Sequence, residues 1–170
     1  MIRQATEKDL EDILEIYNEA ILNTTAVYAY KAHTINERKQ WYDKKMQEGY
    51  PILVFEENDK VMGFATFGPF RAWPAYKYTI EHSIYVHDQY RNKGIGTALV
   101  KEIIRISNER EFATIVAGID EANEMSIKMH KKLGFKYSGT IHKAGFKFGK
   151  WLNLAFYQLE LKGPKDPVED

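Results

Sequence analysis

The chain has 170 residues and a mass of 19.8 kDa, which is enough for one domain of ordinary size and too little for two. Its 24 Lys and Arg residues balance 24 Asp and Glu residues, so no overall field favours nucleic acid or an anionic membrane. It has no cysteine, which excludes a disulfide framework, a thiolate metal site and a cysteine nucleophile, and we expect no bound metal. The charged N-terminus and the lack of a long apolar run argue against a signal peptide and a membrane span, so we expect a soluble cytoplasmic protein.

The first half of the chain is predicted to alternate strands with capped helices. Strands are expected at residues 2–5, 51–56 and 60–67, the last two joined by an Asn-Asp turn. A Thr6-x-x-Asp9 cap predicts one helix, whose apolar residues recur until Ile21. A capping box that begins at Thr34 predicts a second helix, which ends at Gly49. The stretch between these helices has no clear periodicity.

The second half continues this alternation. Strands are expected at residues 78–87, 112–119, 135–143 and 151–161. Helices are expected from Ile95 onward and over residues 123–133, where Gly134 follows as a stop. We therefore predict one α/β (α+β) domain over residues 1–161, with a mixed sheet of about seven strands flanked by about four helices. Residues 162–170, with two prolines and alternating charge, are expected to form a disordered tail.

A basic, glycine-bearing turn separates the strand over residues 78–87 from the helix that follows it. Its residues are Arg91, Asn92, Lys93, Gly94, Ile95, Gly96 and Thr97. The glycines let an anion approach backbone amides, and the start of the helix presents unpaired N–H groups and a positive dipole end. The spacing fits neither the dinucleotide fingerprint nor the triphosphate loop. It favours a pyrophosphate site, with an ordinary strand-to-helix turn as the alternative.

This turn resembles the acetyl-CoA loop of the GNAT superfamily of N-acetyltransferases, and the order of elements is similar over residues 2–161. The resemblance implies a mostly antiparallel sheet, acetyl-CoA as the acetyl donor, and a pyrophosphate held by residues 91–97. The extended arm of the donor is expected to pair as an added strand with the backbone of Ile84, Tyr85 and Val86. One backbone N–H there is a candidate to hold the thioester oxygen.

The helix over residues 123–133 carries a stripe of three polar residues. Asn123, Ser126 and His130 are spaced so that they share one face. Asn123 and Ser126 are candidate donor-binding residues. In the superfamily the place of His130 is often held by a tyrosine that protonates the CoA sulfur, and a histidine that titrates near neutrality suits the same task. The alternative is a surface histidine on a basic helix.

Glu81 is the candidate general base. Strand alternation places it with Ser83 and Tyr85 on one face, three residues before the expected thioester segment. An amine must lose a proton to become a nucleophile, because an α-amino group has a pKa of about 7.7 to 8.0. Glu81 is expected to accept this proton directly or through a water. The alternative is a carboxylate at a strand edge that pairs with Lys77 or Lys60.

A segment rich in aromatic residues, residues 64–78, is the candidate site for the amine that receives the acetyl group. Arg71 is expected to clamp a substrate carboxylate with two hydrogen bonds, and Trp73, Tyr76 and Tyr78 supply rings. The alternative is a hydrophobic hairpin bend with a solvated arginine.

Within the superfamily, the chain is most similar to the phosphinothricin acetyltransferase group, which also includes methionine sulfoximine and methionine sulfone acetyltransferases. The segments that carry this likeness are residues 70–86, the Asn123-x-x-Ser126 and His130-x-x-Leu133-Gly134-Phe135 spacings, and residues 139–151. The resemblance implies an amino-acid acceptor, acid/base roles for Glu81 and His130, and acceptor contacts from Arg71, Tyr76 and Tyr78.

The chain departs from that group after its first helix, where it reads Val27-Tyr28-Ala29-Tyr30-Lys31-Ala32-His33 instead of a Phe followed by Glu-Pro. This loop is expected to close over the acceptor, with Tyr28 as a contact. Dimers are usual in the group, so we expect a homodimer, with Trp73, Trp151 or Phe156 as candidate interface residues. Two other functions stay open: acetylation of a protein N-terminus or side chain, which needs an open groove, and a non-catalytic CoA-binding module.

Overall fold

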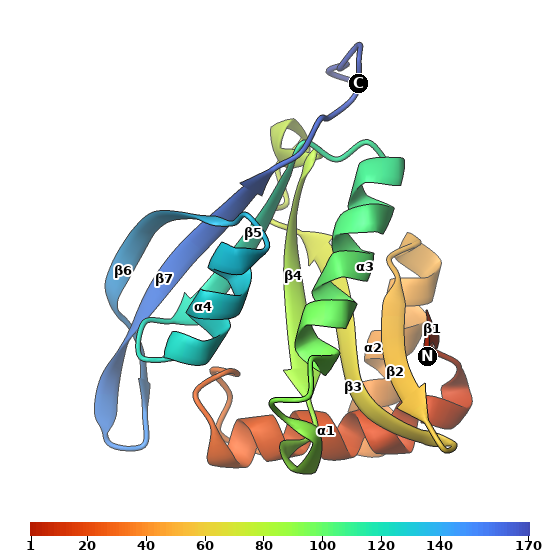
Figure 1. Ribbon diagram of the computed structural model, residues 1–170, viewed down its shortest axis with the longest axis vertical. Coiled ribbons are helices and arrows are strands. Elements are labelled where there is room, and N and C mark those ends of the chain that lie inside the picture. Colours follow the sequence, from red (N-terminus) through yellow and green to blue (C-terminus); the bar gives the residue numbers. More distant parts are fainter. The chain divides into compact units, whose positions relative to one another are not determined.

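The computed structural model describes all 170 residues and contains seven strands and four α-helices (Figure 1). The strands are β1 (Ile2–Gln4), β2 (Ile52–Glu57), β3 (Lys60–Pro69), β4 (Thr79–Val86), β5 (Thr114–Asp120), β6 (Lys136–Lys147) and β7 (Lys150–Glu160). The helices are α1 (Leu10–Asn23), α2 (Ile35–Glu48), α3 (Ile95–Glu109) and α4 (Glu124–Lys132). The strand order is β1-β2-β3-β4-β5-β7-β6, with β4 and β5 parallel. The predicted mixed sheet is confirmed.

The chain divides into two compact units, one of residues 1–67 with 83–100 and one of residues 68–82 with 101–170. In the first unit β2 pairs antiparallel with β1 and β3. One apolar cluster joins these strands to α1, because the helix turns its apolar stripe inward. Its buried members are Ala5, Ile13, Ile16, Ile52, Val54, Val61 and Phe64.

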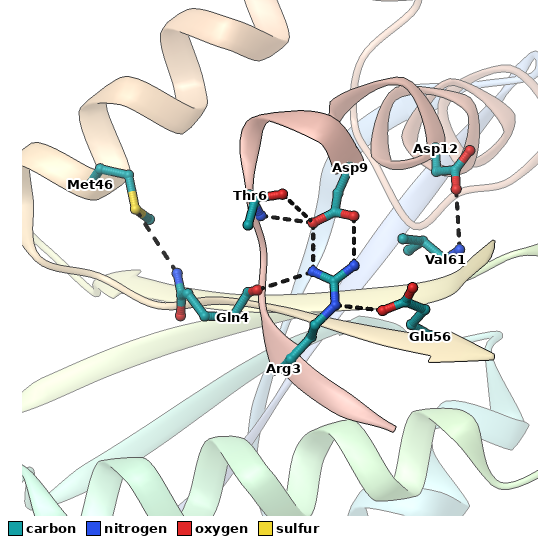
Figure 2. A network of polar contacts seen from close by, with 8 residues as sticks. All are labelled: Arg3, Gln4, Thr6, Asp9, Asp12, Met46, Glu56 and Val61. Carbon is teal, nitrogen blue, oxygen red and sulfur yellow. Dashed lines mark hydrogen bonds and ion pairs between the residues drawn. The ribbon is translucent and has the colours of Figure 1, made fainter. Parts of the chain in front are cut away.

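Arg3 ties the first strand to the start of α1 (Figure 2). Its guanidinium donates two hydrogen bonds to Asp9, at 2.8 Å each, and a third to Glu56 on β2. Hydrogen bonds from Arg3 hold the pKa of Asp9 below its usual range. Asp9 also accepts the backbone N–H of Thr6 at 2.7 Å, so the predicted cap opens a short 3-10 turn at Glu7–Asp9 before α1 begins. The helix therefore starts later than predicted.

The second helix has the caps that the sequence predicts. Thr34 Oγ1 accepts the N–H of Glu37 at 3.2 Å, and Glu37 accepts the N–H of Thr34 at 2.6 Å. Gly49 follows the helix with a φ of 77°, in the left-handed region. The capping box and the glycine stop of α2 are confirmed.

In the second unit β7 pairs antiparallel with β5 and β6, and the first residues of β4 pair with β5. The β6–β7 hairpin, drawn in blue in Figure 1, is longer than predicted, because β6 continues to Lys147. Its register shifts between Tyr137 and Gly139 and again between Ile141 and Gly145. These bulges interrupt the residue alternation on which the shorter prediction relied, while the pairing resumes beyond them.

The last residues, 162–170, belong to the second unit and form no helix or strand, but two hydrogen bonds join them to the residues just before β4. Val168 N–H donates to the Tyr78 hydroxyl at 3.0 Å, and Lys77 Nζ donates to the carbonyl of Asp170 at 2.8 Å. Disorder of this tail and a single-domain organisation stay predictions. None of the helices is both long and apolar enough to span a membrane.

Candidate active site

The predicted pyrophosphate turn lies in the first unit, where β4 leads through a 3-10 turn (Asp88–Tyr90) to α3. Gly94 has a φ of 79° and Asn92 a φ of 64°, so both are left-handed. A Cβ atom at Gly94 would meet no atom within 4 Å, and residues 91–94 are exposed. The helix starts with the bond from Ala98 N–H to Gly94 O, which leaves the amides of residues 95–97 without acceptors inside the helix. The turn can therefore bind an anion at an open surface.

Arg91 is held by helix α1. Its Nη2 donates to Glu19 Oε2 at 2.6 Å, and its Nε donates to the Val86 carbonyl at 3.4 Å. Lys93 reaches over the Tyr90 ring at 5.3 Å and has no ion pair. The Glu19 carboxylate thus already orients the Arg91 side chain. A phosphate that binds Arg91 has to share the guanidinium with Glu19 or displace Glu19 from it.

We expect Arg91→Ala to raise the dissociation constant of acetyl-CoA by about 10-fold, because one charge-assisted hydrogen bond to phosphate is lost. Glu19→Gln frees Arg91 from its ion pair and is expected to leave the constant equal or lower. Calorimetric titration with acetyl-CoA checks both. Unchanged affinity in Arg91→Ala excludes this arginine from the donor site.

The segment Ile84–Val86, which is predicted to pair with the donor arm, packs closely against neighbouring residues of the first unit. A Cβ atom on Gly63 would lie 3.0 Å from the Tyr85 carbonyl oxygen and 3.1 Å from Ile95, so only glycine permits this approach of β3. The Tyr85 ring packs on Phe64 and Tyr17, with ring centroids 5.1 and 5.3 Å apart. Closely packed apolar residues therefore support the segment.

Glu81 is half-buried on β4 and forms no ion pair. Burial raises the pKa of its carboxyl group. The alternative, an ion pair with Lys77 or Lys60, is not formed, and Lys77 Nζ donates to the Asp170 carbonyl instead. An unpaired carboxylate with a raised pKa has the properties of a general base at neutral pH.

His130 lies in the core of the second unit, with only 1% of its surface exposed, so the surface-histidine alternative is wrong. Its Nδ1 lies 2.7 Å from the Ser126 carbonyl oxygen, which can only accept, so Nδ1 carries the proton. Its Nε2 lies 3.1 Å from Nε2 of His82. In the neutral pair, His82 must therefore donate this bond from Nε2. The remaining His82 Nδ1 is buried without a partner.

This pair changes the expectation for His130. Burial lowers the pKa of His130 and, with the charge of His130, lowers the pKa of His82 to about 3. The expectation for His130 used the ordinary pKa of histidine, and burial places the pKa of this ring below that value. The sequence pattern did not identify His82 as the partner of His130, although strand alternation places His82 on the other face of the strand from Glu81. Asn123 acts as the N-cap of α4, since its Oδ1 accepts the Ser126 N–H at 3.2 Å.

The residues predicted to contact the acceptor do not all lie in one segment. Arg71, Trp73 and Tyr76 are exposed on the stretch between β3 and β4, and Trp73 is 74% exposed. The Arg71 guanidinium lies 5.5 Å from the Phe70 ring centroid and has no carboxylate partner. Tyr78 is half-buried and bonded to Val168, and Tyr28 is exposed in the first unit. Arg71 therefore keeps all its hydrogen-bond donors available to a ligand.

Comparison with known proteins gives consistent results. The family described as acetyltransferase (GNAT) domain matches residues 2–155. An L-methionine sulfoximine/L-methionine sulfone acetyltransferase of Salmonella typhimurium is 41% identical over 160 residues, which cover 94% of each chain. The crystal structure of an N-acetyltransferase from Staphylococcus aureus Mu50 has a TM-score of 0.94 and 56% identity, with 94% of this chain and 97% of that chain covered.

A third comparison includes the acetyl donor. A phosphinothricin acetyltransferase from Sinorhizobium meliloti, solved in complex with acetyl-CoA, has a TM-score of 0.92 and 35% identity, with 97% of this chain and 93% of that chain covered. The family match, the fold and the glycine turn all agree. The chain therefore belongs to the GNAT family of acetyl-CoA-dependent N-acetyltransferases.

Proposed function

We propose that this protein transfers an acetyl group from acetyl-CoA to the amino group of a small amino acid of the methionine sulfoximine, methionine sulfone or phosphinothricin type. The observation that carries the proposal is the 41% identity, over nearly the whole of both chains, to an acetyltransferase for the first two compounds. The similarity to a phosphinothricin acetyltransferase supports the same class of acceptor.

The proposed reaction is direct attack of the amine on the thioester. A nitrogen–carbon bond forms, the carbon–sulfur bond breaks, and the proton released by the amine is finally carried by the departing CoA thiol. Glu81 takes the amine proton, directly or through a water, because its unpaired carboxylate has a raised pKa. A backbone N–H of Ile84, Tyr85 or Val86 holds the carbonyl oxygen as negative charge develops on it.

The donor is proposed to bind through residues 91–97, with its pyrophosphate on the open amides and on Arg91 and Lys93. Asn123 and Ser126 stay predicted donor contacts. His130 stays a prediction as the proton donor to the thiolate. Its bond to His82 and its lowered pKa favour Glu81 over His130 as the group that moves a proton near neutral pH.

The acceptor is proposed to meet Arg71, Tyr76 and Tyr78, with Trp73 and Tyr28 as further contacts. Arg71 is the candidate for the acceptor carboxylate, because its guanidinium is exposed and has no carboxylate partner. Such a clamp favours a free amino acid over a peptide, whose first residue has no free carboxylate.

We also propose a cytoplasmic homodimer. Five large apolar side chains are exposed on the β6–β7 hairpin, in a unit whose edge strand is β6. They are Tyr137, Ile141, Phe146, Phe148 and Trp151. A second copy of the chain is the expected partner, and sedimentation velocity is expected to show twice the monomer mass, 19.8 kDa. For Trp151→Glu we expect the monomer mass, and a monomeric unmodified protein contradicts this interface.

The function is tested by thiol release from acetyl-CoA with a panel of acceptors: phosphinothricin, methionine sulfoximine, methionine sulfone, ordinary amino acids, polyamines and short peptides. Turnover confined to the first three supports the proposal. Turnover with peptides alone supports acetylation of protein N-termini. Binding of acetyl-CoA without any turnover supports a non-catalytic module.

A further inference from the structure

Arg38 is a buried cation without a carboxylate partner. It lies in the first turns of α2, is 3% exposed, and forms none of the ion pairs in the protein. The neighbouring carboxylate of Glu37 is used by the capping box, where it accepts the Thr34 N–H. Buried arginines are ordinarily paired with an anion, because a lone buried charge is costly. Arg38 therefore calls for an explanation that packing alone does not supply.

Two aromatic rings lie close to the Arg38 guanidinium. Its central carbon lies 4.1 Å from the centroid of the Tyr17 ring and 4.3 Å from that of Trp41. Phe64 packs against Trp41 and Tyr85 at 6.0 and 5.1 Å. These faces stabilise the positive charge through cation–π contacts, but they leave its N–H groups to be satisfied in the ring plane.

One edge of the guanidinium is incompletely hydrogen-bonded. Nε is buried and has no hydrogen-bond partner. Nη2, which shares that edge, lies 3.2 Å from His33 Nδ1. His33 belongs to the stretch between α1 and α2 that has no helix or strand. A pair of donors on one edge is the geometry with which arginine binds two oxygens of one group.

We propose that Arg38 is a specificity-determining residue that donates from Nε and Nη2 to the two acceptor atoms of a sulfur- or phosphorus-centred group at the distal end of the acceptor. The hydrogen bond between Arg38 Nη2 and His33 Nδ1 breaks when this group binds. The inference rests on the proposed function, and it assigns the residue that recognises the side-chain end of the acceptor.

The surroundings suit such a group better than a carboxylate. A sulfone or sulfoximine carries two strong acceptors and a methyl group on one sulfur, so it needs donors and apolar contacts together. Arg38 supplies the donors, and the rings of Tyr17, Trp41 and Phe64 supply the apolar surface. Tyr85, whose ring contacts Tyr17, belongs to the segment proposed to hold the thioester, so Arg38 lies one ring away from that segment.

The test compares methionine sulfone with methionine, which has the same chain without the two oxygens. A site built to hydrogen-bond a substrate group rejects the analogue that lacks it by up to about 10⁴-fold. We expect Arg38→Met to lower kcat/KM for the sulfone by about 100-fold while kcat/KM for methionine changes by less than about 3-fold. Arg38→Lys keeps the positive charge but lacks the paired Nε and Nη2 donors. It is therefore expected to lose most of the preference for methionine sulfone over methionine.

Arg105→Met is the matched control, because it removes an exposed arginine that only pairs with Glu102 and Glu109 on its own helix. Melting temperature and acetyl-CoA affinity are measured for every variant. An equal loss for sulfone and methionine in both Arg38 variants shows a packing role and overturns the inference. If the unmodified protein binds methionine sulfone without acetylating it and Arg38→Met abolishes binding, the proposed function fails while the inference stands. No binding to the unmodified protein overturns both.

Discussion

Glu81→Gln is expected to lower kcat about 10²- to 10⁴-fold, the usual contribution of a general base, and to leave acetyl-CoA affinity unchanged. The substitution keeps the size and hydrogen-bonding capacity of the side chain but removes the group that accepts the amine proton. Because burial raises the pKa of Glu81, activity of the unmodified enzyme is expected to fall at a higher pH than an exposed glutamate would cause, as acid protonates the carboxylate.

Steady-state kinetics from pH 5.5 to 9 check this expectation. In the variant, the decrease of kcat at acidic pH that is caused by protonation of Glu81 should disappear. Loss of a merely structural role would not change the shape of this pH profile. Glu57→Gln, at the exposed end of β2, is the matched control and should keep full activity. A kcat of Glu81→Gln within about 3-fold of the unmodified enzyme would remove the proposed base.

Acid is expected to destabilise the fold through the His82–His130 pair. In the folded protein both pKa values lie below the ordinary value of 6.5, and that of His82 is about 3. Below pH 6.5 the unfolded chain therefore binds more protons than the folded one, so the stability is fully present above that pH and is lost as pH falls. Between the lowered pKa of His82 and its ordinary value, His82 then costs up to about 1.4 kcal/mol of unfolding free energy per pH unit, and His130 adds to this loss in the same direction.

Between pH 6.5 and 4.5, we expect His82 alone to lower the free energy of unfolding by about 2 to 3 kcal/mol. His82→Gln supplies an amide donor for His130 Nε2 but does not titrate. Its urea-unfolding free energy should therefore fall less steeply with acid than that of the unmodified protein, by about one proton. His142→Gln, an exposed control, should keep the original slope. Identical slopes for His82→Gln and the unmodified protein would show that His82 is protonated in the folded state.

The order of the elements follows from short stretches of sequence, because its determinants are local. The Thr34 capping box and Gly49 bound α2 where the pattern predicts, and the glycine turn before α3 has the left-handed backbone that its residues favour. The errors are local as well. The Thr6 cap opens a 3-10 turn before α1, and bulges carry β6 beyond its predicted end.

The environment of the candidate residues depends on contacts that no local pattern contains. His82 and His130 are 48 residues apart, and Arg91 and Glu19 are 72 apart, so neither pair is visible as a spacing. The position of His130 on its helix was right, but whether that face is covered is decided by the strand that packs on it. Burial then lowered the pKa of its ring.

The sequence by itself determined the elements, their order, the glycine turn before α3 and the likeness to N-acetyltransferases, because caps, glycines and periodicity act over a few residues. Only the tertiary structure decided which charged side chains are buried and which residues they contact. No pattern around Arg38 indicates that the rings of Tyr17 and Trp41 lie within 4.1 and 4.3 Å of its guanidinium carbon. Desolvation and hydrogen-bond geometry depend on neighbours distant in the chain, and these set the chemistry of a site.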